Sequence, residues 1–304
     1  MEHLRELITQ LQLAGVMLKQ GELLCRHTSF QIGGPAAVMT FPDSQEQAAE
    51  IFRLSAKYGV RPAILGAGTN LLAPDEGLDT LLLETRTGLT NIREAGEGCI
   101  EADCGVTMAR LAAFAMEQGL TGLEFAHGIP GTVGGGVYMN AGAYGGEMRQ
   151  VVESVTVMDF SGKVWEIPAA EADFAYRHSR FMDENLLILR ARVRLRPGVR
   201  EEIRAYMTEL MGKRRSSQPL EYPSAGSTFK RPKEGYAAAL IEDAGLKGFT
   251  VGGAQVSEKH AGFVINRGRA TCRDVLQLME QVQQTVYARS GVRLEPEVRV
   301  MEGT

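Results

Sequence analysis

Two glycine clusters are the feature of this sequence most suited to chemistry. The first is Leu65-Gly66-Ala67-Gly68-Thr69-Asn70, and the second runs from Gly128 to Gly146. Glycine accounts for 35 of the 304 residues, well above the average share of about 7%. Such loops present backbone N–H groups that no side chain covers, which suits a diphosphate that needs hydrogen-bond donors more than positive charge.

The two clusters differ in specificity. The first follows an apolar segment, as a dinucleotide-binding loop does, but Leu71 stands where the Rossmann fingerprint has its third glycine. An ordinary tight turn explains its spacing equally well. The second gives the stronger indication, because Gly128-Ile129-Pro130-Gly131-Thr132-Val133-Gly134-Gly135-Gly136 is followed by Asn140-Ala141-Gly142-Ala143-Tyr144. The sequence G-x-x-x-x-G-K-[ST] is absent, so an ATP-hydrolysing loop is not supported.

Three polar residues outside these clusters are candidates for chemistry, and each has a plain alternative. Arg177 lies among aromatic and basic residues, which favours a loop arginine or an anion clamp in a chain of net charge −4. Ser227 is not in the G-x-S-x-G sequence of hydrolases, so a turn serine is the simpler interpretation. Glu297 equally fits a solvated charge at a strand edge.

The composition is that of a globular chain in a reducing compartment. Hydrophobic residues make up 44% and charged residues 23%, which excludes fibrous and disordered classes, and the acidic excess of 37 over 33 disfavours a nucleic-acid partner. The four cysteines form no C-x-x-C pair and the five histidines lack metal-binding spacing, so we expect no disulfide framework and no metal. Without a signal sequence or an apolar run of about 18 residues, the chain is expected to be cytoplasmic, with no membrane partner.

The elements that must position these residues follow from periodicity and capping. The length of 304 residues predicts two domains, or one large domain with an insertion. Ser44 is expected to cap a helix over 45–57, and a breaker-rich loop over 216–227 marks a domain boundary. The other predicted elements are a leading helix around 4–11, strands over 61–65, 80–83 and 100–104, a helix over 107–119, a hairpin over 155–167, a half-exposed strand over 189–196, helices over 203–215 and 237–244, a strand over 263–265, a helix over 271–289 and a last strand over 297–301 in which Val298 alternates with Val300.

Seven segments, taken together and in this order, resemble the UDP-N-acetylenolpyruvoylglucosamine reductases, the MurB family of FAD enzymes in peptidoglycan precursor synthesis. The resemblance extends over nearly the whole chain from Arg26 onward, and the short spacing from Gly248 to His260 resembles the shorter, type II form. The segments are Arg26-His27-Thr28-Ser29-Phe30-Gln31-Ile32-Gly33-Gly34, Leu65-Gly66-Ala67-Gly68-Thr69-Asn70, Gly128-Ile129-Pro130-Gly131-Thr132-Val133-Gly134-Gly135, Asn140-Ala141-Gly142-Ala143-Tyr144, Tyr176-Arg177, Gly226-Ser227-Thr228-Phe229-Lys230 and Pro296-Glu297-Val298-Arg299.

The resemblance implies an α/β and α+β fold in three parts. A two-part, non-Rossmann FAD-binding domain of PCMH type would be followed by a C-terminal α+β substrate-binding domain. The first FAD-binding part would cover residues 1–85, with the C-terminal strand 293–304 returning to it. The second would cover 86–215, and the substrate domain 216–292.

The resemblance also implies a reaction and catalytic residues. NADPH would reduce FAD, and hydride would pass from the flavin to the enolpyruvyl group of UDP-GlcNAc-enolpyruvate, giving UDP-N-acetylmuramate. Arg177 matches the family's arginine beside the substrate carboxylate, where negative charge develops. Ser227 matches the serine that protonates the resulting carbanion, and Glu297 matches an acid whose pKa a nearby like charge would raise.

The binding residues implied by the resemblance come from the same segments. The substrate would meet Tyr176, Lys230, Arg231 and Gln218. One branch of the family has Asn and Lys in place of Arg231 and Gln218, so individual diphosphate contacts stay open. The partners would be small molecules only, and no oligomeric state is predicted. FAD would be held by Leu65, Gly66, Ala67, Gly68, Thr69, Asn70, Gly128, Pro130, Gly131, Thr132, Gly134, Gly135, Asn140, Gly142 and Tyr144.

Two other functions fit part of the sequence. An FAD oxidase of the same fold, acting on an alcohol or a sugar, would share both glycine clusters but not the segments around Ser227 and Glu297. A catalytically inactive nucleotide-sugar-binding protein would keep the fold alone. The joint presence of Arg177, Ser227 and Glu297 argues against the second.

Overall fold

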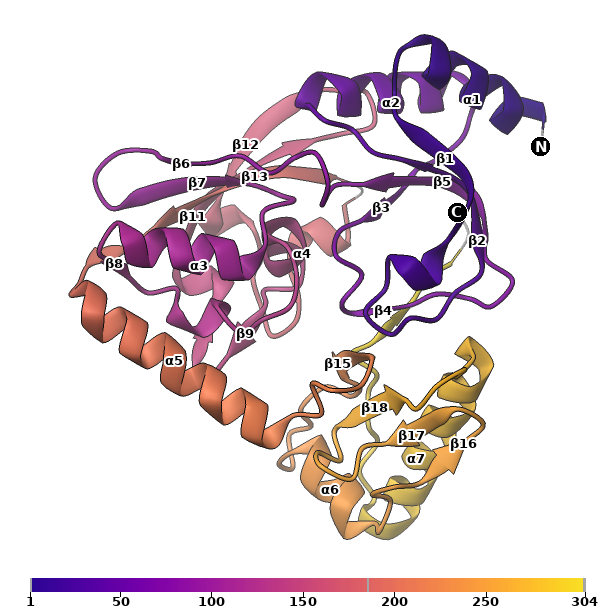
Figure 1. The fold of residues 1–304 in the computed structure, drawn as a ribbon, viewed down its shortest axis with the longest axis vertical. Helices are drawn as coiled ribbons and strands as arrows, with labels where there is room; N and C mark the ends of the chain where they lie inside the picture. The colour runs from indigo at the N-terminus through magenta and orange to yellow at the C-terminus, as the bar shows by residue number, and fades with distance from the viewer. Residues whose placement is uncertain (1, 185, 303–304) are drawn as a thin grey trace.

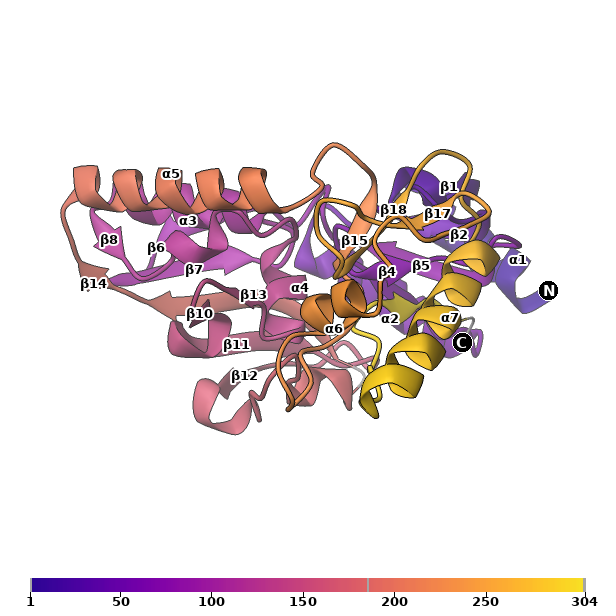
Figure 2. The same cartoon turned by 90° about the horizontal axis from the view of Figure 1, so that it is seen from below.

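The computed structural model describes residues 2–184 and 186–302, and its framework is three β-sheets (Figure 1). The first and third sheets have four strands each, and the second has five. The sheets follow one another along the chain, so each is built mainly from local sequence. Figure 2 shows α5 along the edge of the part that holds the second sheet, and α7 beside the third.

The first sheet has the strand order β1-β2-β5-β3, in which β2, β5 and β3 run parallel and β1 is antiparallel. Leu7 of α1, Phe52 of α2 and Leu81 of β5 belong to its apolar core. Ser44 caps α2 by accepting the Gln47 N–H at 3.2 Å, which confirms the predicted cap. The elements are α1 (Glu2–Leu13), β1 (Leu18–Leu23), β2 (Pro35–Thr40), α2 (Gln45–Lys57), β3 (Ala63–Leu65) and β5 (Leu78–Glu84).

The second sheet has the order β12-β11-β13-β7-β6, with every neighbouring pair antiparallel. Thr107 caps α3 by accepting the Arg110 N–H, and the predicted hairpin is formed by β11 and β12. The elements are β6 (Ile92–Glu94), β7 (Cys99–Asp103), α3 (Met108–Glu117), α4 (Val133–Tyr138), β11 (Val152–Met158), β12 (Val164–Pro168), β13 (Leu187–Arg194) and α5 (Arg200–Ser217).

Strand β13 confirms the predicted half-exposed strand and begins two residues earlier than expected. It lies inside the sheet between β11 and β7, and its first three residues, 187–189, are all buried. From Leu189 onward buried and exposed or half-exposed positions alternate as predicted, and the Arg190 side chain pairs with Asp103 at 3.2 Å, while Arg192 pairs with Glu153 at 2.9 Å. The strand is half-exposed although it lies inside the sheet, because an antiparallel sheet can leave one face to solvent.

The third sheet has the order β15-β18-β17-β16 and packs against α7. Thr271 and Asp274 form the predicted capping box of α7, and Gly291 ends the helix with φ +73°. The predicted loop over 216–227 is wrong at both ends, because α5 continues to Ser217 and β15 begins at Ser224. The elements are β15 (Ser224–Ser227), α6 (Ala237–Asp243), β16 (Thr250–Val251), β17 (Ala254–Val256), β18 (Phe263–Asn266) and α7 (Cys272–Ser290).

The predicted last strand is shorter than expected. Only Arg299–Val300, β19, is a strand, and it pairs in parallel with β4, Leu71–Leu72. Val298 is buried but Val300 is 39% exposed, so the expected alternation on one face is wrong. The remaining short elements are η1 (Leu24–Arg26), β8 (Leu120–Thr121), η2 (Glu124–Ala126), β9 (Gly142–Ala143), β10 (Gly146–Glu147), η3 (Met148–Gln150), η4 (Ala169–Glu171), η5 (Arg180–Met182) and β14 (Arg196–Pro197).

The core of the C-terminal part is completed by residues from the N-terminal part. Phe30, Ile32 and Leu72 are buried in the same apolar cluster as the inner face of α7. The Ser29 hydroxyl donates to the Ser224 carbonyl at 2.6 Å, and the Asn266 amide donates to the Phe30 carbonyl at 3.1 Å. No described helix is long and apolar enough to cross a membrane.

Candidate active site

The two glycine clusters meet in space. We call residues 66–70 the first glycine loop and residues 128–132 the second. A Cβ added to Gly66 would lie 2.9 Å from the Thr132 hydroxyl oxygen, and one added to Gly131 would lie 3.4 Å from the Thr69 hydroxyl oxygen. The first loop follows β3 directly and the second leads into α4. The end of a strand of the first sheet and the start of α4 therefore meet at one junction.

Both glycine loops carry backbone N–H groups that have no acceptor in the described part of the protein. Among residues 2–184 and 186–302, no acceptor faces the N–H of any residue of the first loop, or the N–H of Gly128, Gly131 or Thr132. Buried or half-buried donors are rarely left unpaired in folded proteins. A ligand with several acceptor oxygens, such as a diphosphate, fits this set of donors.

The rest of the second cluster serves packing and hydrogen bonding inside the protein. The N–H of Gly134 donates to the Cys104 carbonyl at 2.8 Å, and that of Gly135 to the Thr132 hydroxyl at 3.4 Å. A Cβ on Gly134 would lie 2.8 Å from the Cβ of Cys104, so glycine is needed there for the approach of α4 to β7. The N–H groups of Gly134 and Gly135 are therefore used within the protein, by the Cys104 carbonyl and by the capping Thr132 hydroxyl.

Arg177 and Glu297 form an ion pair between two distant segments. The Arg177 Nε donates to Glu297 Oε1 at 2.5 Å, and its Nη2 donates to the Gly142 carbonyl at 3.3 Å. The side chains are 21% and 12% exposed, respectively. Because the pair is largely shielded from water, its attraction is stronger than that of a surface pair.

Burial raises the pKa of Glu297 above its ordinary value, although the Arg177 guanidinium and, more weakly, the Lys230 ammonium act in the opposite direction. The direction agrees with the prediction. Among the groups of the protein itself, desolvation is the leading cause, and the expected effect of a substrate carboxylate stays a prediction.

Ser227 lies next to this ion pair through the backbone. The Glu297 N–H donates to the carbonyl of Thr228 at 2.8 Å, so the residue after Ser227 is bound to Glu297 itself. The Asn70 amide donates to the Glu297 carbonyl at 3.0 Å, which joins the first glycine loop to the segment that contains Glu297. Ser227 is exposed at the end of β15. The structure thus brings the three predicted catalytic residues to one place.

The predicted substrate-binding residues are divided between two groups. The Arg231 N–H donates to the Tyr176 hydroxyl at 3.1 Å, and the Lys230 ammonium pairs with Glu295 at 3.5 Å. Gln218 follows α5 and makes no hydrogen bond to the other three in the part of the chain that is described. Its Oε1 is buried without a hydrogen-bond donor among those residues, which leaves it available to a ligand.

The remaining predicted cofactor residues follow α4. Tyr144 is 41% exposed, and the Gly142 carbonyl accepts from Arg177. Asn140 is fully buried, and its amide donates to the Ala175 carbonyl at 2.9 Å and to Glu147 at 3.0 Å. Its side-chain donors are therefore used within the protein.

Arg214 of α5 is a residue that the sequence analysis missed. Its side chain lies against the second glycine loop, where a Cβ on Gly128 would be 3.2 Å from its Cδ. The described residues give its guanidinium no hydrogen bond and no ion pair, and burial lowers its pKa. The sequence signal for it is the basic run Lys213-Arg214-Arg215 at the end of the predicted helix over 203–215, which the helix dipole explains equally well.

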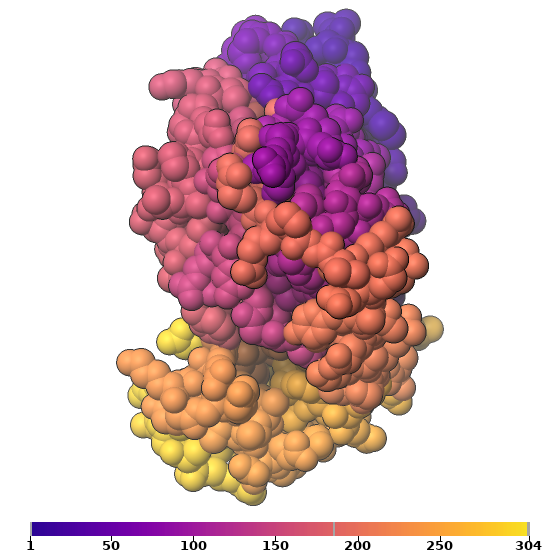
Figure 3. Space-filling model, turned by 90° about the vertical axis from the view of Figure 1, so that its left-hand side faces the viewer, coloured from indigo at the N-terminus to yellow at the C-terminus, as the bar shows by residue number. Residues whose placement is uncertain are grey.

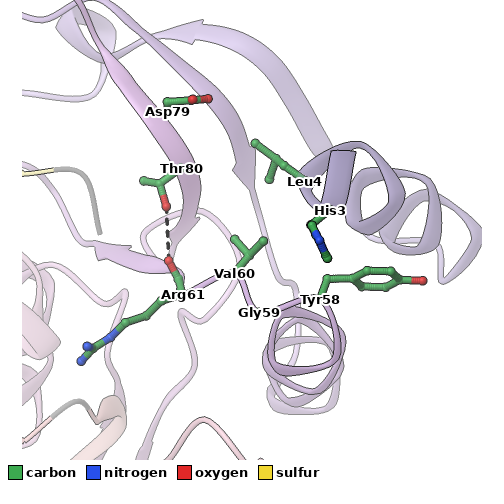
Figure 4. Close-up of a pocket in the computed structure, with 8 residues that line it drawn as sticks. All are labelled: His3, Leu4, Tyr58, Gly59, Val60, Arg61, Asp79 and Thr80. Atoms are coloured by element: carbon green, nitrogen blue, oxygen red, sulfur yellow. Dashed lines mark hydrogen bonds between the residues drawn. The ribbon is translucent and has the colours of Figure 1, made fainter. Parts of the chain in front are cut away.

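Two other features lie apart from this site. A hollow of about 400 Å³ is lined by residues of α1, the α2–β3 connection and β5, including His3, Tyr58 and Asp79 (Figure 4). It contains none of the predicted site residues. The described residues include no group of three or more His, Cys, Asp or Glu side chains that could hold a metal. Figure 3 shows a different hollow in the surface, where the orange and yellow C-terminal part meets the magenta part.

Comparison with known families matches two segments. Residues 35–168 match the FAD binding domain, and residues 218–301 match the UDP-N-acetylenolpyruvoylglucosamine reductase, C-terminal domain. Two proteins named UDP-N-acetylenolpyruvoylglucosamine reductase are similar over nearly their whole length. The one from Agathobacter rectalis is 45% identical and covers 95% of this chain and 96% of its own. The one from Caldanaerobacter subterraneus subsp. tengcongensis is also 45% identical, covering 94% and 95%.

Solved structures agree with the sequence relatives. The crystal structure of UDP-N-acetylenolpyruvylglucosamine reductase (MurB) from Thermus caldophilus is similar with a TM-score of 0.83 at 32% identity, covering 94% of this chain and all of that chain. An alkyldihydroxyacetonephosphate synthase, with a TM-score of 0.50 and 16% identity over 64% of this chain and 40% of that one, shares the fold alone. Because relatives named for one enzyme match nearly the whole chain and both matched domains are present, the chain belongs to the UDP-N-acetylenolpyruvoylglucosamine reductase family.

Proposed function

We propose that Arg177, Glu297 and Ser227 carry out the reduction step of this family's reaction. The chain is an FAD-dependent oxidoreductase of peptidoglycan precursor synthesis, in which NADPH is the reductant and UDP-GlcNAc-enolpyruvate becomes UDP-N-acetylmuramate. The observation that carries the residue assignment is the shielded Arg177–Glu297 ion pair beside the strand that ends in Ser227.

The two glycine loops are proposed to hold the FAD. Their unpaired N–H groups suit the oxygens of its diphosphate, and the Arg214 guanidinium beside Gly128 adds a positive charge that lacks a partner among the described residues. Bound there, FAD would supply hydride to the substrate. Gly134 and Gly135 contribute to this site by shaping α4 rather than by direct donation.

Arg177 is proposed to stabilise the charge that develops during hydride transfer. Hydride adds to the vinyl CH₂ of the enolpyruvyl group, and the electron pair moves through the adjacent carbon onto the substrate carboxylate. A guanidinium fixed near that carboxylate gains more from the increased charge than from the ground state, which lowers the barrier. The hydrogen bond from its Nε to Glu297 Oε1, which the carboxyl group accepts in either protonation state, keeps the guanidinium from turning away.

Ser227 is proposed to complete the reaction by giving its hydroxyl proton to the carbanionic carbon. One hydride and one proton are thereby added across the double bond. A hydroxyl is a weak acid, so its alkoxide must be stabilised or quickly reprotonated. Glu297, whose pKa burial raises, is proposed to remain protonated to higher pH than a free glutamate and to donate a hydrogen bond toward the developing charge.

The UDP part is proposed to lie over the residues that join the second and third sheets. Tyr176 and Arg231 meet there, Lys230 is adjacent in sequence, and the buried Oε1 of Gln218 is available to a donor. Arg231 stacks over Tyr236, 4.1 Å from the ring centroid, which leaves its charge near the surface for a phosphate.

The domain limits and the compartment are also proposals. We assign 1–85 with 293–304 to the first FAD-binding part, 86–215 to the second, and 216–292 to the substrate domain, which is supported by one sheet falling within each. The four free cysteines are compatible with action in the cytoplasm.

An anaerobic visible spectrum tests the proposed function. NADPH is expected to bleach the flavin band, and UDP-GlcNAc-enolpyruvate to restore it. If the band returns only when oxygen is admitted, the protein is an oxidase of the same fold with another substrate. If the purified protein binds no flavin, the nucleotide-sugar-binding alternative replaces the enzyme.

A further inference from the structure

Arg177 stands at the tip of a tight turn in an unfavourable backbone conformation. Backbone hydrogen bonds between Ala175 and His178 close the turn in both directions, at 3.1 and 3.2 Å. Arg177 has a φ of +54°, in the left-handed region that glycine or asparagine usually occupies at this position of a turn. Another residue stays there only where its surroundings hold it.

Two buried polar side chains hold both ends of this turn. Asn140 and Ser179 are 0% exposed. The Asn140 Nδ2 donates to the Ala175 carbonyl at 2.9 Å, and the Ser179 hydroxyl donates to the Tyr138 carbonyl at 2.7 Å. Tyr138 is the last residue of α4 and Asn140 comes two residues later. The turn is therefore fixed at both ends to the same short helix.

Asn140 is itself held in place from the opposite side. Its Oδ1 accepts the Arg149 N–H at 2.9 Å, and its Nδ2 also donates to Glu147 at 3.0 Å. Asn140 has a φ of +41°, which asparagine tolerates better than most residues. The side chain is thus rigid and is committed to the turn.

We propose that Ser179 and Asn140 are positioning residues that aim Arg177. They keep the turn in the conformation that places the guanidinium 2.5 Å from Glu297. Because α4 also begins at the second glycine loop, one helix sets the distance between the arginine and the proposed flavin site. This inference rests on the proposed function, in which Arg177 faces the substrate carboxylate.

A double-mutant cycle in the FAD-loaded enzyme tests the inference by anaerobic stopped flow. Ser179→Ala is expected to slow re-oxidation by UDP-GlcNAc-enolpyruvate about 10- to 100-fold, since misplacing a reacting group by about 1 Å has this effect. Reduction by NADPH is expected to change less than about twofold. In an Arg177→Gly background no guanidinium remains to be aimed, so adding Ser179→Ala is expected to cost less than about twofold.

Two further variants make the cycle specific. Thr40→Val is the matched control, because the fully buried Thr40 hydroxyl also donates to a backbone carbonyl, that of Leu82 at 3.0 Å, in the first sheet. It is expected to leave re-oxidation unchanged in both backgrounds. Ser179→Cys keeps nearly the size of the side chain but replaces the hydroxyl by a weak thiol donor, and it is expected to reproduce the selective loss to a smaller extent if Ser179→Ala folds poorly.

An NMR measurement separates positioning from folding. In arginine-¹⁵N-labelled enzyme without substrate, the Arg177 Nε–H, assigned by its absence from Arg177→Gly, is expected to be protected from exchange and to lose protection in Ser179→Ala. Unchanged protection, or equal losses in both backgrounds, overturns the positioning role and leaves that of Arg177 standing. Normal re-oxidation by Arg177→Gly overturns the proposed function itself.

Discussion

At the scale of single residues, the site combines one cation, one carboxyl group and one hydroxyl with different tasks. Arg177 and Glu297 are 120 positions apart in sequence yet share a hydrogen bond of 2.5 Å. Burial raises the pKa of Glu297 above its ordinary value. Substitutions at this scale should therefore affect one half-reaction and leave the other intact.

Removing the proposed acid should separate the half-reactions. Ser227→Ala is expected to leave flavin reduction by NADPH nearly intact and to slow re-oxidation by the enolpyruvyl substrate about 100-fold or more, the usual scale for loss of a general acid. Rapid-reaction absorbance of the flavin measures both rates. Ser224→Ala, on the same strand, is the matched control and should leave both unchanged. Equal losses in both half-reactions for Ser227→Ala would make the serine structural.

The raised pKa of Glu297 predicts a pH dependence with a definite sign. The protonated carboxyl donates a hydrogen bond, so its contribution is present at low pH and is lost as the pH rises through the raised pKa. The re-oxidation rate should therefore fall on the alkaline side in the wild type. Glu297→Gln keeps a donor at every pH and should lack this fall when measured from about pH 5 to 9. Identical profiles would exclude the proposed role.

At the scale of elements, one helix and two loops form the proposed cofactor site. The glycine loops provide backbone donors without acceptors among the described residues, and α5 places Arg214 against the second of them. The desolvated guanidinium has no partner in the described part of the chain, which costs folding free energy. A guanidinium that is retained at this cost in folding free energy indicates that a ligand binds it.

Arg214→Gln should therefore have opposite effects on binding and stability. FAD affinity of the apoprotein is expected to fall about 10- to 100-fold, which corresponds to one charge-assisted hydrogen bond. The free energy of unfolding of the apoprotein should not fall, because the variant removes a half-buried charge that has no partner among the described residues. Quenching of flavin fluorescence and denaturant unfolding measure the two quantities. Lys213→Gln, which removes an exposed pair with Glu209 on the same helix, should leave FAD affinity unchanged; equal affinity in both variants would remove Arg214 from the site.

At the scale of the whole molecule, the C-terminal part depends on the N-terminal part for its core. Phe30 and Leu72 are fully buried against residues that surround α7. Hydrogen bonds cross the same boundary, among them those from Ser29 and from Asn266 and those from the N–H groups at the start of α7 to Asp75. The first sheet and the C-terminal domain are therefore expected to behave as one cooperative unit.

Truncating Phe30 tests this dependence. Phe30→Ala is expected to lower the opening free energy of the α7 amides, measured by hydrogen exchange, by about 3–5 kcal/mol, since a large buried side chain is lost. Phe52→Ala removes a side chain of equal size from the core of the first sheet and should weaken α2 more than α7. Unchanged protection of α7 in Phe30→Ala would show that the C-terminal core is independent.

Local order was largely determined by the sequence. The caps at Ser44, Thr107 and Thr271 and the boundaries of α2 and α7 follow from neighbouring residues, because helix ends are satisfied by side chains three positions away. The family resemblance also follows from short segments in a fixed order. These features are predictable since each depends on a few consecutive residues.

Long-range arrangement was decided only by the tertiary structure. The ion pair of Arg177 with Glu297, the unpaired donors of the first glycine loop and the lone Arg214 each depend on segments brought together by packing. The same holds for Asn140, predicted as a cofactor residue, whose side-chain donors bind the Arg177 turn and Glu147 instead. Periodicity predicts which face of a helix or strand is buried. It does not predict which element packs against that face, because packing partners depend on burial over the whole chain.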